Sequence, residues 1–190
     1  MRFLVIPEDH RNDQYMLEPI LSELVRSAGF ANPKVRVCRD PLMGGVSEAL
    51  KPERLEEVFA RYKGMIDVFL LCVDRDADLN RQARLDILEA RFGPRLIFIP
   101  SQAWEEIETW MLAGLDLPAS WRWQEVRGAR DVKEAYFEPL AGDQGLSAEP
   151  GGGRRTLGRL AARRVGRIRQ RCPEDFDLLG RRIEALRTSA

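Results

Sequence analysis

The chain contains the stretch MIDVFLLCVDRDAD at residues 65–78, in which an apolar run ends in three alternating carboxylates. Residues 66–73 are rich in Val, Ile, Phe and Leu, which is typical of a parallel strand that is buried on both faces. In open α/β sheets, ligands bind beyond the carboxyl ends of such strands. We therefore expect Asp74, Asp76 and Asp78 to lie where a ligand site would be.

A bound cation would explain why three carboxylates stand so close together in the sequence. Without it they would repel one another by roughly 3 kcal/mol per pair at ~5 Å and an effective dielectric near 20. A ligand set made only of oxygen favours Mg²⁺, Mn²⁺ or Ca²⁺ over zinc. An EF-hand calcium loop is excluded, because its obligatory Gly and Glu are replaced by Leu79 and Leu85. The remaining alternative is that Asp76 or Asp78 only caps the helix that follows.

The charge of the chain is unevenly distributed. The 190 residues carry no net charge, but residues 151–190 contain eleven Arg and four acids, a balance of +7 that leaves residues 1–150 at −7. The three cysteines are far apart and only one His accompanies them, which argues against zinc and against a disulfide framework. The sequence shows neither a signal-peptide pattern nor an apolar run that could span a membrane. We therefore expect a cytoplasmic protein with no membrane partner.

The hydrophobic pattern alternates between strands and helices, which predicts a Rossmann-like α/β domain with a parallel sheet of about four strands. Pro19 predicts a kink in the first helix or a helix that starts near Glu18. The predicted domain covers residues 1–115, followed by a connector at 116–153 and a basic helical segment, an appendage, at 154–190. The expected strands cover residues 2–8, 34–39, 66–73 and 95–101, and the expected helices cover roughly residues 16–29, 55–62, 80–92, 104–114, 131–140, 157–168 and 174–186.

Two further acids are candidates for the same site. Glu8 ends the first predicted strand, and the carboxyl ends of parallel strands meet at one edge of a sheet. Glu108 lies with Glu105 and Glu106 in the first turns of a predicted helix, where acids ordinarily interact with the helix dipole. The functional alternative is that Glu108 joins the carboxylate cluster.

The basic segment predicts a surface that binds nucleic acid. Residues 154–171 contain eight Arg and no acid, arranged around a helical stripe of apolar residues. Guanidinium groups bind phosphates in a bidentate manner, although an Arg-rich face can also be plain solvated surface. We expect Arg159, Arg163 and Arg167 to contact nucleic acid.

Glu8 at the end of the first strand and Asp74-x-Asp76 at the end of a later parallel strand resemble the Toprim domain. This fold is shared by topoisomerases, bacterial primases, recombination proteins and the OLD-type nucleases. The resemblance covers roughly residues 1–115. The stretches IETWMLA at 107–113 and CPEDF at 172–176 are similar to an OLD-nuclease-related, bacterial Toprim-like family that is associated with mobile elements or phage defence.

The resemblance implies a Mg²⁺-dependent or Mn²⁺-dependent hydrolase that cleaves phosphodiester bonds in DNA or RNA, a nuclease. In such an enzyme Asp74 and Asp76 would hold the metal, and Glu8 would be the general base or a further ligand. Asp78 and Glu108 would be auxiliary acids. A homodimer, and a partner protein encoded by a neighbouring gene, are also compatible with this resemblance.

Two other classes of protein fit part of the pattern. A receiver-like signalling module would use Asp74 as its phospho-acceptor, next to the acid pair Glu8-Asp9. Its switch hydroxyl would be Ser101, but it also needs a lysine after a fifth strand, and Lys133 lies in a predicted helix instead. A non-catalytic protein that binds a nucleotide or nucleic acid would use the acids only to hold a structural ion.

Overall fold

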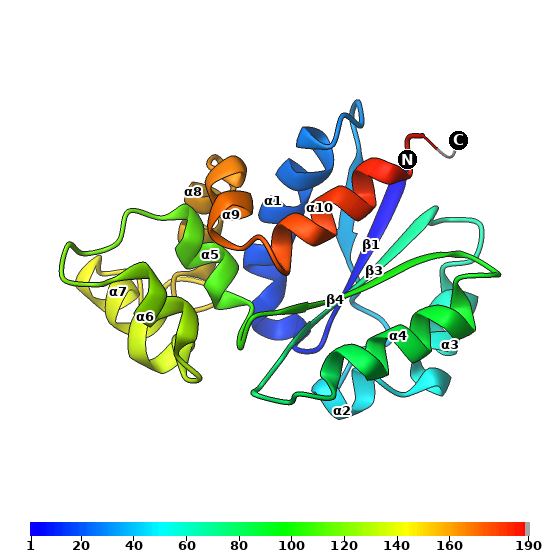
Figure 1. Ribbon diagram of the computed structural model, residues 1–190, viewed down its shortest axis with the longest axis horizontal. Coiled ribbons are helices and arrows are strands. Elements are labelled where there is room, and N and C mark those ends of the chain that lie inside the picture. Colours follow the sequence, from blue (N-terminus) through cyan, green and yellow to red (C-terminus); the bar gives the residue numbers. More distant parts are fainter. Residues whose placement is uncertain (189–190) are drawn as a thin grey trace.

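The computed structural model describes residues 1–188, which form one four-stranded sheet surrounded by helices (Figure 1). The strand order is β2-β1-β3-β4, and every neighbouring pair is parallel. The predicted α/β class with a parallel sheet is therefore confirmed, and the strand that contains the apolar run lies inside the sheet. The strands are β1 (Arg2–Pro7), β2 (Lys34–Val37), β3 (Val68–Asp74) and β4 (Ile97–Ala103).

The helices connect the strands and then continue beyond the last strand. The first helix begins earlier than predicted, because the Asp9 side chain accepts a hydrogen bond from Arg11 N at 2.8 Å, and it runs through Pro19. No helix among residues 1–188 has both the length and the apolar character to cross a membrane. The helices are α1 (His10–Ser27), α2 (Val46–Ala49), α3 (Pro52–Arg61), α4 (Arg81–Phe92), α5 (Glu108–Gly114), α6 (Trp123–Gly128), the π-helical turn η1 (Lys133–Phe137), α7 (Glu138–Asp143), α8 (Arg154–Ala162), α9 (Val165–Arg171) and α10 (Phe176–Ala185).

Helices cover both faces of the sheet, which explains why its strands are apolar without interruption. Figure 1 shows α1 and α10 on one side and α2, α3 and α4 on the other. Alternate residues of each strand belong to two separate hydrophobic clusters: Phe3 and Val5 pack toward α1, whereas Leu4 and Ile6 pack toward α3 and α4. On the second side, the ring of Phe59 contacts three other Phe rings at centroid distances of 4.9 to 5.4 Å.

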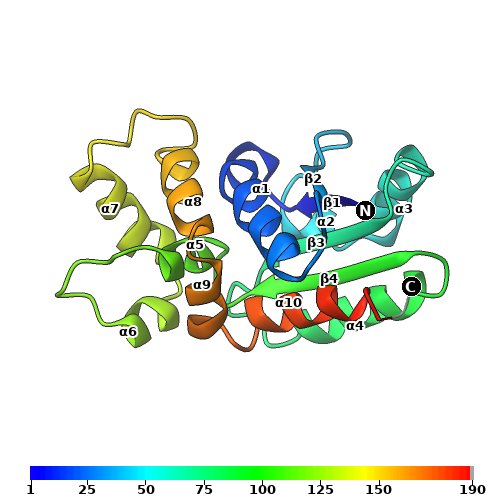
Figure 2. The ribbon, with the colours of Figure 1, turned by 90° about the horizontal axis from the view of Figure 1, so that it is seen from above.

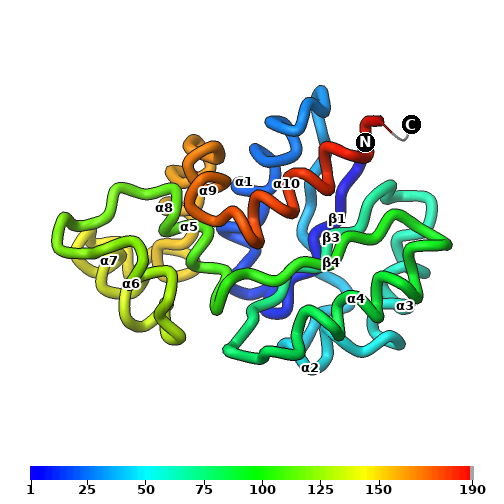
Figure 3. Tube along the Cα trace, viewed as in Figure 1, coloured from blue at the N-terminus to red at the C-terminus, as the bar shows by residue number. Residues whose placement is uncertain are grey.

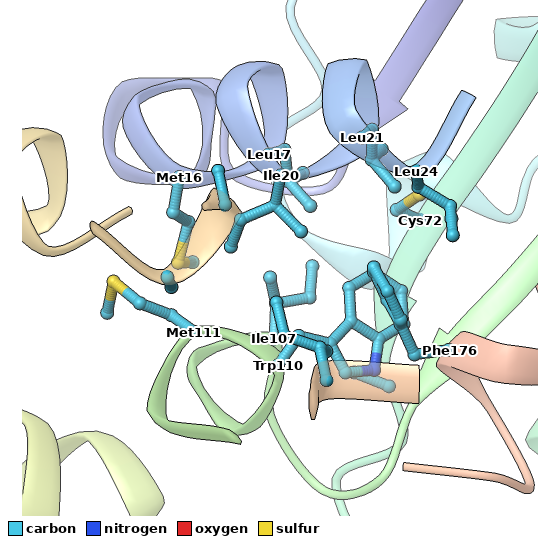
Figure 4. Packing of buried hydrophobic residues seen from close by; sticks show 14 of the residues in the cluster. Met16, Leu17, Ile20, Leu21, Leu24, Cys72, Ile107, Trp110, Met111 and Phe176 are labelled. Atoms are coloured by element: carbon cyan, nitrogen blue, oxygen red, sulfur yellow. The ribbon is translucent and has the colours of Figure 1, made fainter. Parts of the chain in front are cut away.

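The helices after residue 153 contribute to the same hydrophobic cluster as α1 and the sheet. Tracing the tube in Figure 3 shows α10 returning across the sheet beside α1. In the close view of Figure 4, the apolar face of α1 lies opposite Ile107, Trp110 and Met111 on and before α5, and opposite Phe176. The division of the chain at residues 115 and 153 stays a prediction, and the described core is continuous across both positions.

Helix α8 lies very close to α1, because Gly158 leaves no side chain between them. A methyl group at Gly158 would lie 2.8 Å from Met16 Cα and 3.1 Å from Tyr15 O. We expect Gly158→Ala to lower the free energy of unfolding by about 1–3 kcal/mol, since the two helices must separate to admit the methyl group. Urea denaturation measures this change. Gly166→Ala in α9 is the control: it has no atom within 4 Å, and we expect no loss there. Equal stabilities of the two variants would contradict this description of the helix contact.

Candidate functional site

The structure brings Glu8 and Asp74 together at the carboxyl edge of the sheet. The strands β1 and β3 are neighbours, and Pro7 pairs with Cys72, so the residues that follow leave the sheet side by side. Glu8 Oε2 accepts a hydrogen bond from Asp74 N at 3.1 Å. Asp74 Oδ1 accepts another from Ile107 N, at 2.7 Å, in the loop before α5.

Asp13 is a third acid of this cluster. It was not among the predicted site residues, because the first helix was expected to begin only near residue 16, after Asp13. It lies in the first turn of α1 and is only 7% exposed. Its Oδ2 atom accepts a hydrogen bond from Asp9 N at 3.3 Å. The signal that could have identified it is its spacing, because Asp13 precedes Leu17 and Ile20 on the apolar face of the helix.

Burial and mutual repulsion perturb all three carboxyl groups. Burial raises the pKa of Glu8 to about 7 and that of Asp13 to about 8. Burial also raises the pKa of Asp74 well above its usual range, and the charges of Glu8, Glu108 and Asp13 raise it further. Within residues 1–188 no Lys, Arg or His forms an ion pair with any of the three. Asp13 is buried and Glu8 and Asp74 are partly buried. Carboxylates withdrawn from water without a counter-charge are unfavourable, and a cation would relieve that cost.

The two later aspartates lie apart from this cluster. The Asp76 side chain is 47% exposed, and its Oδ2 atom is 3.3 Å from Nη2 of Arg81. Asp78 Oδ1 accepts a hydrogen bond from Asn80 N at 2.9 Å, a local contact just before α4. The charge of Asp76 nevertheless contributes to the raised pKa of Glu8, whereas the charge of Arg81 opposes that rise.

The loop that carries Asp76 is strained and is held in place by Glu105. Asp76 and Ala77 have φ angles of 52° and 55°, a left-handed conformation that costs roughly 1 kcal/mol or more for a residue with a side chain. The Glu105 backbone oxygen accepts hydrogen bonds from Arg75 N and Asp76 N, at 2.9 and 3.2 Å, and its Oε2 atom accepts one from Ala77 N at 2.7 Å. Glu105 also forms an ion pair with Arg75. The sequence analysis assigned Glu105 to a helix dipole, and its part in holding this loop was not anticipated.

Glu108 is buried and forms an ion pair with Arg154. It begins α5, is 5% exposed, and accepts a hydrogen bond from Arg154 Nε at 3.0 Å. Arg154 is itself 5% exposed and comes from the basic C-terminal segment. The Glu108 charge raises the pKa of both Asp74 and Asp13, but its side chain is bound to Arg154, and a functional role for Glu108 stays a prediction.

The three arginines predicted to bind nucleic acid differ in their surroundings. Arg159 and Arg163 are exposed, and neither forms an ion pair in the part of the chain that the structure describes. Arg167 is bound to Asp116 at 2.8 Å, together with Arg164 at 2.6 Å. Part of the predicted basic surface is therefore neutralised by acids of the same chain.

The donor set fits a cation that is held by few protein ligands. Among residues 1–188 no group of three or more His, Cys, Asp or Glu side chains is arranged to hold a metal ion. Mg²⁺ in phosphate-processing sites commonly takes one or two carboxylates, and water and phosphate oxygens complete its coordination. The Glu8 and Asp74 carboxyls match that pattern.

Comparisons of the chain with protein-family models, curated proteins and solved structures find no match. The fold and the site together define a class: an α/β protein whose parallel sheet presents partly buried carboxyls at the ends of two neighbouring strands. The Toprim resemblance stays a prediction.

Proposed function

We propose that the protein is a Mg²⁺-dependent or Mn²⁺-dependent Toprim-like enzyme that cleaves phosphodiester bonds in nucleic acid. The observation that carries this proposal is the pair formed by Glu8 and Asp74, two partly buried acids at the ends of neighbouring strands, in which Glu8 Oε2 accepts a 3.1 Å hydrogen bond from the Asp74 backbone N–H. Their charges repel each other and have no ion-pair partner within residues 1–188. A divalent cation would remove that repulsion and would bring phosphate oxygens to the sheet edge.

Each acid has a distinct part in this proposal. Asp74 holds the metal, and Glu8 is the general base or a further ligand; its pKa of about 7 suits proton transfer near neutral pH. Asp76, which lies apart from this pair on the exposed loop, would act through a water bound to the metal. When bound, the cation polarises the phosphoryl oxygen and activates water. Asp78 and Glu108 are auxiliary, the first through its hydrogen bond from Asn80 N before α4 and the second through Arg154.

The alternative classes make different demands on the same residues. A receiver-like module needs a lysine beside Asp74, whereas the Lys133 ammonium group lies 3.2 Å from Glu134 on a partly exposed turn. A non-catalytic binder needs no cleavage chemistry at all. Incubation with labelled DNA or RNA and Mg²⁺, and separately with a beryllofluoride salt and Mg²⁺, distinguishes the three. The proposal expects strand cleavage in the first mixture and no acyl-phosphate analogue in the second.

Mn²⁺ is expected to raise the melting temperature of the protein, because it binds the folded acids and not the unfolded chain. At a hundredfold excess over its Kd the gain is about 2.7 kcal/mol, or about 5–10 °C for a chain of this size. Asp74→Asn keeps the acceptor for Ile107 N but removes a partly buried carboxyl group that can ionise. It should therefore be more stable than the wild type without metal and should gain nothing from Mn²⁺.

The matched control for this measurement is Asp143→Asn. Asp143 is exposed at the end of α7 and forms no ion pair within residues 1–188, so its variant should respond to Mn²⁺ as the wild type does. If Asp74→Asn still gained the full stabilisation, the cation would be bound elsewhere and the proposal would lose its metal site.

A further inference from the structure

A groove with a volume of about 560 Å³ runs along the outer side of α1, and three arginines line it. Arg39 follows β2, and Arg155 and Arg159 lie one turn apart on α8. Figure 2 shows α1 and α8 side by side, so residues from distant parts of the sequence line one groove. Glu18 is the one acid among the lining residues, which leaves the groove with a net charge of +2.

These three arginines have no acidic partner, unlike most of the arginines in the basic segment. Within residues 1–188 none of them forms an ion pair, and all three are exposed. Like charges that converge on one groove repel each other, and Glu18, the one acid of the lining, offsets only part of that repulsion. Guanidinium groups bind phosphate through paired hydrogen bonds, and a chain of phosphates would supply one anion to each arginine. The arginines of the segment that are already paired with acids are Arg154, Arg164, Arg167, Arg169, Arg181 and Arg182.

The groove begins close to the acid cluster. Cys38 N donates a hydrogen bond to Val5 O at 2.7 Å, so Arg39 leaves the sheet at the same edge as Glu8. Helix α1 starts beside Glu8 and forms the groove wall from Gln14 to Ser22, a length of about 12 Å at 1.5 Å per residue. That length matches about three successive phosphates of one nucleic-acid strand.

We propose that this groove binds the backbone of a single nucleic-acid strand and leads it to the acids at the sheet edge. The inference rests on the proposed function for its direction, but the binding itself needs no metal. Tyr15, half-buried on the groove wall against Gly151, adds an aromatic side chain next to the positive charges. Basic grooves with aromatic side chains are the common form of single-strand binding sites. The exposed Glu18 disfavours a second, parallel row of phosphates, which a duplex would bring.

The test measures binding of a short, fluorescently labelled single-stranded DNA in EDTA, so that no cleavage occurs. We expect Arg155→Gln/Arg159→Gln to weaken binding about tenfold or more and to flatten the log–log salt dependence by about 0.7 for each lost phosphate contact. Arg39→Gln should show the same change for one contact. The control Arg91→Gln/Arg95→Gln removes the same charge from exposed positions at the end of α4, on the other face of the sheet, and should bind as the wild type does.

Three results would overturn the groove proposal: unchanged affinity and slope in the double variant, an equal loss in the control, or tighter binding of the matching duplex through the same arginines. Asp74→Asn separates this proposal from the proposed function, because it should bind DNA normally in EDTA. If the wild-type protein cleaves nucleic acid with Mg²⁺ but the groove variants bind DNA as the wild type does, only the groove proposal is rejected. If binding depends on the groove arginines but no cleavage is seen with Mg²⁺, only the proposed cleavage function is rejected.

Discussion

Exchange of Glu8 for Gln is expected to lower the rate of nucleic-acid cleavage by about 10²–10⁴, the usual contribution of a positioned acid or base. Gln keeps the oxygen that accepts the hydrogen bond from Asp74 N, so the sheet edge should keep its geometry. It cannot accept a proton as a carboxylate does. If Glu8 is the general base, metal binding and nucleic-acid binding should survive while cleavage falls.

Single-turnover cleavage at saturating Mn²⁺, with a metal titration of the same variant, measures both properties. A fall in metal affinity together with the rate would make Glu8 chiefly a ligand. Glu53→Gln, an exposed acid at the start of α3, is the control and should leave both values unchanged. Wild-type behaviour of Glu8→Gln in both assays would remove Glu8 from the site and would undercut the Toprim interpretation.

Replacement of Asp13 by Asn is expected to change how stability depends on pH. The folded-state pKa of Asp13 is about 8, far above that of an ordinary Asp, so between roughly pH 4 and 8 the folded protein binds the proton more tightly than the unfolded chain. The stabilising contribution of this proton is complete below that window and is lost as the pH rises through 8. Removing the carboxyl should therefore stabilise the protein at pH 9 by several kcal/mol, on the order of 5, and have little effect at pH 4.

Urea denaturation in EDTA at several pH values between these limits measures the effect. Asn retains an oxygen that can accept the hydrogen bond from Asp9 N, which limits the change to the charge. Asp143→Asn, at the exposed end of α7, should leave the pH profile unchanged. Parallel profiles for wild type and Asp13→Asn would mean that Asp13 is ionised in the folded state without cost, and the cluster would then be less buried than described.

The fold could be predicted from the sequence because its strands are buried on both faces. A continuous apolar run such as residues 68–73 has few other interpretations, and the alternation with helices leaves a parallel sheet as the simplest topology. The meeting of Glu8 and Asp74 followed from that topology, since both residues end strands that are neighbours in the sheet. The position of Asp76 did not follow, because a left-handed turn redirects the chain immediately after β3.

The fate of the basic segment could not be predicted, because it depends on which acids its helices meet after folding. Arg154 pairs with Glu108, Arg182 with Glu89, and Asp116 holds two further arginines. The opposite charges of the two parts of the chain thus neutralise each other to a large extent in the folded protein. Composition alone suggested a basic tail directed toward a ligand, whereas only the arginines beside α1 and a few others keep their charge unpaired.

Asp175, just before α10, links the C-terminal helix to the loop that orients the candidate site. Its Oδ2 atom accepts hydrogen bonds from Trp104 N and Trp110 Nε1, both at 2.8 Å, and so fastens the last helix to the loop that follows β4. The same loop supplies the Ile107 N–H that orients Asp74. A truncation that ends before Asp175 would thus remove the acceptor that fixes this loop and would loosen the loop that orients Asp74. Assays of the candidate site therefore need the C-terminal helix as well as the sheet.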